Sequence, residues 1–260
     1  MDTPDTTIKL DQNECPWDWP ESVKSKVLNQ TEKFHWNRYP SAFATDLTAS
    51  LGESIGVPPE CLITGPGTNY LLTIILNSLT KKCNGKIVAA RPSFLLYEAN
   101  FKYEGINYET WNLNDELDYD VESLKNLPEQ SLVVFASPNN PVGNSLPKHK
   151  FEKLLGENPN SIFIADEAYY EFCDEDYLSL LEDHSNLIIV RTFSKTIGAA
   201  GVRFGYGIAN KNYISEFMKL RLPYLLNAFS LAAVKVILEN QEIIDSRVEK
   251  LKGMREEMFS

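Results

Sequence analysis

The most informative stretch of the sequence is Leu187-Ile188-Ile189-Val190-Arg191-Thr192-Phe193-Ser194-Lys195. Its first four residues form a short apolar run, which predicts a buried strand. Lys195 then follows the carboxyl end of that strand, and open α/β sheets bind their ligands at this end. A solvated surface lysine is the simpler interpretation, so the assignment depends on the rest of the chain.

Two further residues give Lys195 a chemical context. Ser194 precedes it, and Arg203 follows eight residues later. A hydroxyl and a guanidinium so placed can both hold a phosphate group. The lysine amine then stays available for a Schiff base with a carbonyl, as in the chemistry of pyridoxal 5′-phosphate (PLP).

Apolar runs alternate with helical segments along most of the chain. Strands separated by helices of this length predict an α/β fold, a mainly parallel sheet with helices on both faces. We expect an N-terminal arm with a first helix over 1–40, a large domain over 41–241, and a final helix within 242–260. The expected strands are 86–90, 108–113, 131–136, 161–165, 187–190 and 204–209; the expected helices are 42–55, 68–79, 93–103, 147–155, 213–221, 228–238 and 243–258.

Composition narrows the function classes. The chain has 260 residues and a net charge of -11, which argues against non-specific binding to nucleic acid or to an anionic membrane. Four scattered cysteines and three histidines predict no metal site, and free thiols suit a reducing cytosol. The polar, acidic N-terminus is unlike a signal peptide, and no apolar run is long enough to span a bilayer. We therefore expect a cytoplasmic protein with small-molecule partners.

Other polar segments follow the expected strands. Gly65-Pro66-Gly67-Thr68-Asn69 opens a helix whose first amides can bind an anion, although such a segment can also be a simple turn. The segment 137–143 is a Pro/Asn/Gly turn on the alternative interpretation. Asp166 and Tyr169, three residues apart, can together bind a heteroaromatic ring. Alternatively, Asp166 merely caps a helix. Tyr97 can line a site or pack in the core.

Taken in order, these segments resemble a fold-type I PLP-dependent aminotransferase of class I/II, and most closely the histidinol-phosphate aminotransferase branch. The resemblance spans about residues 8 to 258. Its matching stretches are Asn13-Glu14, Arg38-Tyr39-Pro40, Gly65-Pro66-Gly67-Thr68, Pro92-Ser93-Phe94-Leu95-Leu96-Tyr97, Ser137-Pro138-Asn139-Asn140-Pro141, Asp166-Glu167-Ala168-Tyr169, Arg191-Thr192-Phe193-Ser194-Lys195 and Gly201-Val202-Arg203-Phe204-Gly205.

The resemblance implies a role for each site residue. Lys195 would carry the PLP Schiff base and move the substrate proton. Asp166 would face the pyridine nitrogen, while Asn140 and Tyr169 would hydrogen-bond the ring oxygen. The remaining cofactor contacts would come from Tyr97, stacked on the ring, and from a phosphate site made of Ser194, Arg203, Gly67, Thr68, Asn69 and, from the partner subunit of a homodimer, Tyr39. Asn13 and Trp17 would lie beside the substrate.

The implied activity is amino-group transfer between an amino donor and a 2-oxo acid, with histidinol phosphate and 2-oxoglutarate as the leading pair. An amino-acid-phosphate decarboxylase or an aromatic aminotransferase of the same fold is an alternative. The resemblance also implies a C-terminal small domain after the last helix, and nothing in these 260 residues matches it. A non-catalytic PLP-binding fragment is therefore a further alternative.

Overall fold

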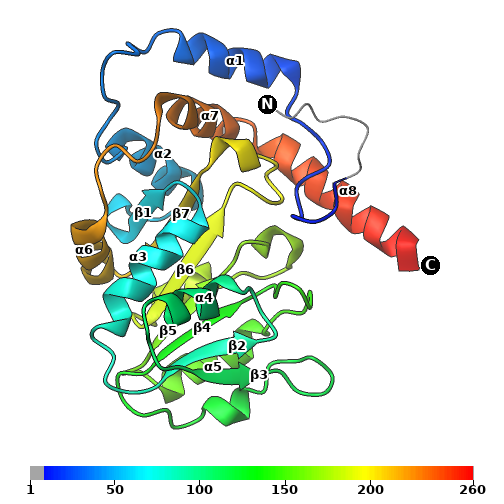
Figure 1. Ribbon diagram of the computed structural model, residues 1–260. Coiled ribbons are helices and arrows are strands. Elements are labelled where there is room, and N and C mark those ends of the chain that lie inside the picture. The colour runs from blue at the N-terminus through cyan, green and yellow to red at the C-terminus, as the bar shows by residue number, and fades with distance from the viewer. Residues whose placement is uncertain (1–8, 260) are drawn as a thin grey trace.

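The computed structural model describes residues 9–259. It is built around a seven-stranded sheet with the order β1-β7-β6-β5-β4-β2-β3 (Figure 1). The strands are β1 (Leu62–Gly65), β2 (Ile87–Arg91), β3 (Glu109–Asn112), β4 (Leu132–Ala136), β5 (Ile162–Asp166), β6 (Leu187–Thr192) and β7 (Gly205–Ala209).

Most of the sheet is parallel. Strands β2 to β6 pair in parallel, with Val134 beside Ile164 and Ile164 beside Ile188 in neighbouring strands. Only β7 runs against its neighbours, because it pairs antiparallel with both β6 and β1. The predicted α/β class with a mainly parallel sheet is confirmed.

Helices cover both faces of this sheet. Helices α3, α4 and α6 lie on one face, and α1, α2, α5 and α7 lie on the other. In chain order the helices are α1 (Glu21–Thr31), α2 (Thr45–Ile55), α3 (Thr68–Thr80), α4 (Leu96–Tyr103), α5 (Lys148–Glu157), α6 (Lys211–Leu220), α7 (Ala228–Leu238) and α8 (Gln241–Phe259).

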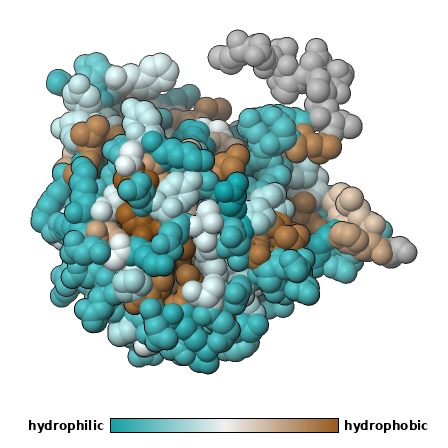
Figure 2. Space-filling view, turned by 60° about the horizontal axis from the view of Figure 1, so that its bottom comes forward, coloured by the Kyte–Doolittle hydropathy of each residue, from teal (hydrophilic) through white to brown (hydrophobic). Residues whose placement is uncertain are grey.

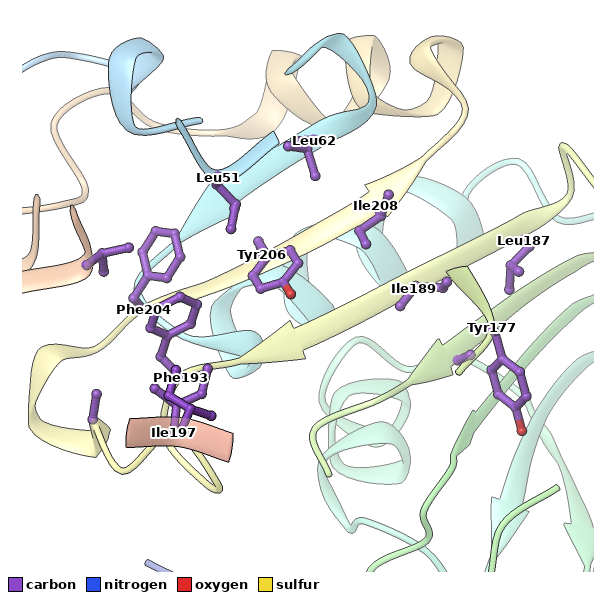
Figure 3. Close-up of a cluster of buried hydrophobic side chains, with 14 of the residues drawn as sticks. Leu51, Leu62, Tyr177, Leu187, Ile189, Phe193, Ile197, Phe204, Tyr206 and Ile208 are labelled. Atoms are coloured by element: carbon purple, nitrogen blue, oxygen red, sulfur yellow. The ribbon is translucent and has the colours of Figure 1, made fainter. Parts of the chain in front are cut away.

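Alternation along the strands explains the two layers. In β4, Val133 and Phe135 belong to the core under α5, whereas Leu132 and Val134 belong to the core under α3. Successive strand residues point to opposite faces, so a sheet covered on both sides needs continuous apolar strands. Figure 3 shows part of the core that lies under α5 and contains Val133 and Phe135. In this core, Phe193 and Phe204 pack beside Tyr206.

The structure departs from the expected elements in several places. Helix α2 begins at Thr45 rather than at residue 42, because Ala44 before it is left-handed, with φ +53°. Strand β1 was not predicted, because its four residues are too few to show a period. Helix α4 begins at Leu96 rather than at residue 93, since the segment after β2 remains a bend through Phe94. Within residues 9–259, no helix is long and apolar enough to cross a membrane.

Candidate active site

The polar segments predicted to follow strands do meet at one cavity. It lies at the carboxyl edge of β4, β5 and β6 and has a volume of about 740 Å³. Parallel strands place their carboxyl ends together, so segments distant in sequence converge there. The lining residues are Asp11, Gln12, Asn13, Glu14, Thr68, Asn69, Phe94, Ala136, Asn140, Asp166, Ala168, Tyr169, Thr192, Ser194, Lys195, Ala200, Gly201 and Arg203.

Lys195 is half-buried in this cavity. Its Nζ donates to the main-chain oxygen of Gln12 at 2.6 Å and lies 6.0 Å from the centre of the Tyr169 ring. Burial lowers the pKa of the Lys195 amine and outweighs the opposing Glu14 carboxylate, while the nearby Arg203 guanidinium lowers the pKa further. A lowered pKa leaves more of the amine uncharged at neutral pH, and the uncharged amine is the form that attacks a carbonyl.

Asp166 ends strand β5 on the floor of the cavity. The residue is only 3% exposed, and burial raises the pKa of its carboxyl to about 6. Its Oδ2 accepts from the hydroxyl of Tyr97 at 2.8 Å, and its Oδ1 accepts from the Ala168 amide at 3.1 Å. A buried carboxylate is stabilised by a cation placed beside it, so this position fits a protonated ring nitrogen.

Tyr97 does not occupy the position expected of it. Its side chain is fully buried and absent from the cavity lining, because it lies behind Asp166 and donates to that carboxylate. The expected stacking of Tyr97 on a cofactor ring is therefore corrected. Phe94 is the aromatic residue of that segment that lines the cavity, and it packs edge-on against Tyr97. The sequence carried this signal, since Phe94 lies in the same matching stretch, three residues earlier.

An anion cradle forms between two loops at one end of the cavity. The Nη1 of Arg203 donates to the Ser194 hydroxyl at 3.2 Å. Gly67, with φ +88°, precedes helix α3, and a Cβ on it would lie 2.6 Å from Nη2 of the same arginine. Thr68 and Asn69, the first two residues of α3, line the cavity beside it. A guanidinium, a hydroxyl and a helix N-terminus together fit a phosphate group.

The opposite side of the cavity carries hydrogen-bonding groups for a ring and a substrate. The Tyr169 hydroxyl accepts from Nδ2 of Asn13 at 3.0 Å, and burial raises the pKa of this phenol. Asn140 lines the same side. Gln12 and Asp11 were not predicted; Gln12 acts through a main-chain carbonyl, for which a sequence carries no signal.

Two predicted site residues lie elsewhere. Tyr39 is 80% exposed, and its ring stacks on that of Tyr224 at 4.5 Å. Trp17 is outside the lining, and Nζ of Lys250 lies 4.3 Å above its ring. In a single chain, therefore, Tyr39 does not reach the phosphate cradle and Trp17 does not reach the substrate side.

A buried ion-pair network supports the turn that carries Asp166 and Tyr169. Arg191, on β6, contacts the Glu167 carboxylate through Nε at 2.8 Å and through Nη2 at 2.7 Å. Its Nη2 also contacts Asp176 at 2.7 Å, and the guanidinium lies over the Tyr170 ring. Breaking one partner of a buried pair is strongly destabilising, so this network fixes the turn against β6.

The site contains nothing that resembles a metal centre. Across residues 9–259, no three His, Cys, Asp or Glu side chains are grouped so that they could hold a metal ion. The polar groups instead match the parts of PLP: an amine for the aldehyde, a buried carboxylate for the ring nitrogen and a cradle for the phosphate. These residues fit the cofactor.

Comparison with known proteins agrees with this geometry. The chain is 34% identical to histidinol-phosphate aminotransferase from Pyrococcus furiosus, over 96% of this chain and 72% of that protein. It is 32% identical to the same enzyme from Clostridium novyi, over 94% and 69%.

Solved structures share the fold. The histidinol-phosphate aminotransferase from Sinorhizobium meliloti, in complex with PLP, superposes with a TM-score of 0.84 at 24% identity, covering 95% of this chain and 68% of that one. The L-threonine-O-3-phosphate decarboxylase from Porphyromonas gingivalis superposes with a TM-score of 0.75 at 22% identity, covering 88% and 68%.

The family model described as aminotransferase class I and II matches residues 5–260, nearly the full sequence. The cofactor of this family is PLP. The chain belongs to the class I and II aminotransferases.

Proposed function

We propose that this aminotransferase moves an amino group from histidinol phosphate to 2-oxoglutarate, giving the corresponding ketone and glutamate. The observation that carries the proposal is the meeting of the Lys195 amine, the Asp166 carboxylate and the Ser194–Arg203 cradle in one 740 Å³ cavity. The choice of donor rests on relatives such as those from Pyrococcus furiosus, Clostridium novyi and Thermococcus kodakarensis, which are 34%, 32% and 31% identical and are named histidinol-phosphate aminotransferases.

Bound PLP supplies an electron-accepting ring that stabilises negative charge at the donor's Cα. Lys195 holds the cofactor covalently and, once displaced by the donor, moves the proton at Cα. Its lowered pKa suits both tasks near neutral pH. Asp166 keeps a proton on the ring nitrogen, because a buried carboxylate gains most from a neighbouring positive charge.

The other site residues hold the cofactor and orient the substrate. Ser194, Arg203 and the amides at the start of α3 bind the phosphate, so the ring keeps one position while Lys195 is released. Asn140 and Tyr169 donate to the ring oxygen, and Phe94 covers the ring face. Asn13 lies on the substrate side beside Tyr169.

A homodimer is part of this proposal. Tyr39 and Tyr224 form a stacked, exposed aromatic pair, and Trp36 on the same chain segment is 91% exposed. Large exposed aromatic residues are typical of a surface that a partner covers. We expect Tyr39 to reach the phosphate cradle of the partner subunit, in a cytoplasmic enzyme.

A donor panel tests the proposal. PLP-loaded protein is mixed with histidinol phosphate, an aromatic amino acid or threonine O-phosphate, each with 2-oxoglutarate, and glutamate is measured. Glutamate from histidinol phosphate at a kcat/KM at least about a hundredfold above the other donors supports the assignment. A preference for the aromatic donor would replace it.

The decarboxylase is the second candidate, because the same fold carries that reaction in the Porphyromonas gingivalis protein. Carbon dioxide released from threonine O-phosphate without glutamate would identify it. If borohydride fixes PLP to Lys195 but no donor reacts, the chain is a cofactor-binding protein without turnover.

A further inference from the structure

Arg247 differs from the other basic residues of helix α8. It is only 6% exposed, whereas the Arg255 side chain on the same helix is 57% exposed and pairs with its neighbour Glu256. Burying a guanidinium is costly unless its donors are satisfied. The contacts of Arg247 therefore indicate what this residue does.

Arg247 joins three segments of the chain. Its Nη1 donates to the main-chain oxygen of Ile197 at 2.8 Å, and its Nη2 donates to that of Asp18 at 2.7 Å. The guanidinium carbon lies 4.5 Å from the centre of the Trp19 ring. One side chain of α8 thus holds the N-terminal arm, here residues 9–20, against the loop 193–204 (the lysine loop).

The contact on the lysine loop lies two residues after Lys195 in the chain. Gly198 donates its amide to the main-chain oxygen of Lys195 at 2.9 Å and has φ +72°. A Cβ on Gly198 would lie 2.7 Å from Nη1 of Arg247 and 3.1 Å from Sγ of Cys15. A glycine is needed here, because the arginine, the arm and the turn after Lys195 meet without room for a side chain.

The same arm reaches into the cavity a few residues earlier. Gln12 accepts from Nζ of Lys195, and Asn13 donates to the hydroxyl of Tyr169. The part of the arm that Arg247 holds, Asp18 and Trp19, follows these residues by five to seven positions. In Figure 1 the arm, in dark blue, runs beside α8.

We propose that Arg247 is a positioning residue, which clasps the N-terminal arm to the lysine loop and so holds Gln12 and Asn13 over the cofactor site. An arginine suits this role because its planar fork donates to two carbonyls in fixed directions while its face stacks on the Trp19 ring. A lysine at this position would have one nitrogen and could not span both carbonyls in the same way. The inference adds to the proposed function but does not depend on which donor is used.

Hydrogen exchange tests the clasp. We compare Arg247→Lys and Arg247→Met with the wild type, with and without PLP, and use Arg255→Lys and Arg255→Met as matched controls on the same helix. Loss of a charge-assisted hydrogen bond should speed exchange about tenfold in the arm and in residues 196–202. Strand β5 should exchange as in the wild type, and both Arg255 variants should leave all segments unchanged.

A second readout separates positioning from a general loss of stability. The absorbance of lysine-bound PLP changes with pH, and its midpoint depends on the groups around the lysine nitrogen. The midpoint should move in Arg247→Lys and stay fixed in Arg255→Lys. Trp19→Leu should speed exchange in the same two segments, and its effect should be less than additive with Arg247→Lys.

Unchanged exchange in the arm of Arg247→Lys would overturn the proposal. So would an equal increase in β5, which would mark a general loss of stability. If Arg247→Met does not fold, Arg247→Lys alone decides. Hydrogen exchange measured without PLP tests the Arg247 contacts even if no amino donor reacts. Failure of the proposed function can therefore be told apart from failure of the proposed role of Arg247.

Discussion

The two walls of the cavity are built differently. The cofactor wall contains Asp166, Ser194, Lys195 and the start of α3, all of which lie at the end of a buried strand or within three residues after it. The substrate wall is the segment 11–14 of the arm. It contacts the rest of the site through the bond that Gln12 accepts from Lys195 and the bond that Asn13 donates to Tyr169. The first wall is rigid because the sheet fixes it, and the second depends on a few contacts.

This difference separates two kinds of change. Substitutions on the cofactor wall should change chemistry or PLP affinity strongly, because the sheet cannot rearrange around them. Substitutions on the arm should change substrate affinity more modestly.

The largest effect is expected from Asp166→Asn. An amide cannot hold the ring nitrogen protonated, so kcat should fall about a hundredfold or more while PLP stays bound. Steady-state kinetics and the cofactor absorbance measure the two quantities, and Asp183→Asn, an exposed position, is the control. Transamination at the wild-type rate would remove the role given to Asp166.

The same substitution should stabilise the protein when PLP is absent. The carboxyl pKa is about 6 when folded and about 3.8 in the reference state, so the folded state binds more protons between these values and stability falls as pH rises through that range. At pH 7 the cost is fully present, on the order of 3 kcal/mol. Thermal unfolding should give a higher Tm for Asp166→Asn than for the wild type at pH 7, and nearly equal Tm values below pH 4. An equal difference in Tm at both pH values would show that the ionised carboxylate is not what destabilises the wild type.

Substitution of Tyr39 tests whether a partner subunit contributes to the active site. Tyr39→Phe and Lys195→Ala chains should each be weak alone. Mixed and allowed to exchange, half of the dimers carry both lesions in one site and none in the other, so activity should rise to about a quarter of wild type. Mixed samples no more active than the separate ones would count against a shared site.

Gly67→Ala should weaken PLP binding. A methyl group there would lie 2.6 Å from the Arg203 guanidinium, and the residue has φ +88°. Gly56→Ala is a matched control, since Gly56 also has a positive φ, +70°, but nothing within 4 Å of its Cβ position. Backbone strain costs about 1–3 kcal/mol in both, while PLP titration should show weaker binding only in Gly67→Ala. Equal PLP affinities would mean that the cradle tolerates displacement of the arginine.

The smallest effect is expected on the arm. Asn13→Ala removes a solvent-exposed hydrogen bond to the Tyr169 hydroxyl, so KM for the donor should rise by roughly fivefold with little change in kcat. Gln12→Ala is the control, because it keeps the main-chain carbonyl that Lys195 uses. A large fall in kcat for Asn13→Ala would move this residue to the chemical step.

The sequence predicted the cofactor wall well and the substrate wall poorly. Strand ends such as Asp166 and Thr192 follow apolar runs that leave little choice of structure. Phe94 was missed because stacking depends on which of two aromatic residues in one turn faces the cavity, and this is set by the start of α4. Trp17 was misplaced because the path of the arm depends on contacts with α8, more than two hundred residues away.

The end of α8 shows what a periodic pattern leaves open. The helix was predicted over 243–258, but within it only Ile244, Arg247 and Val248 are buried. Met258 and Phe259 are 85% and 86% exposed, and Figure 2 shows the end of this helix as a projection at the right of the view, with apolar residues on its surface. Periodicity gives the face of a helix that is apolar, not what covers it.

The span of the cavity lining, from Asp11 to Arg203, has a consequence for biogenesis. A growing chain cannot complete the cofactor site until the segment through Arg203 has left the ribosome and the sheet has closed, because long-range pairings form late. PLP therefore has no comparable site on the unfolded chain and acts as a reporter of completed folding. At a hundred times its dissociation constant, PLP would add about 2.7 kcal/mol to the stability of the native state.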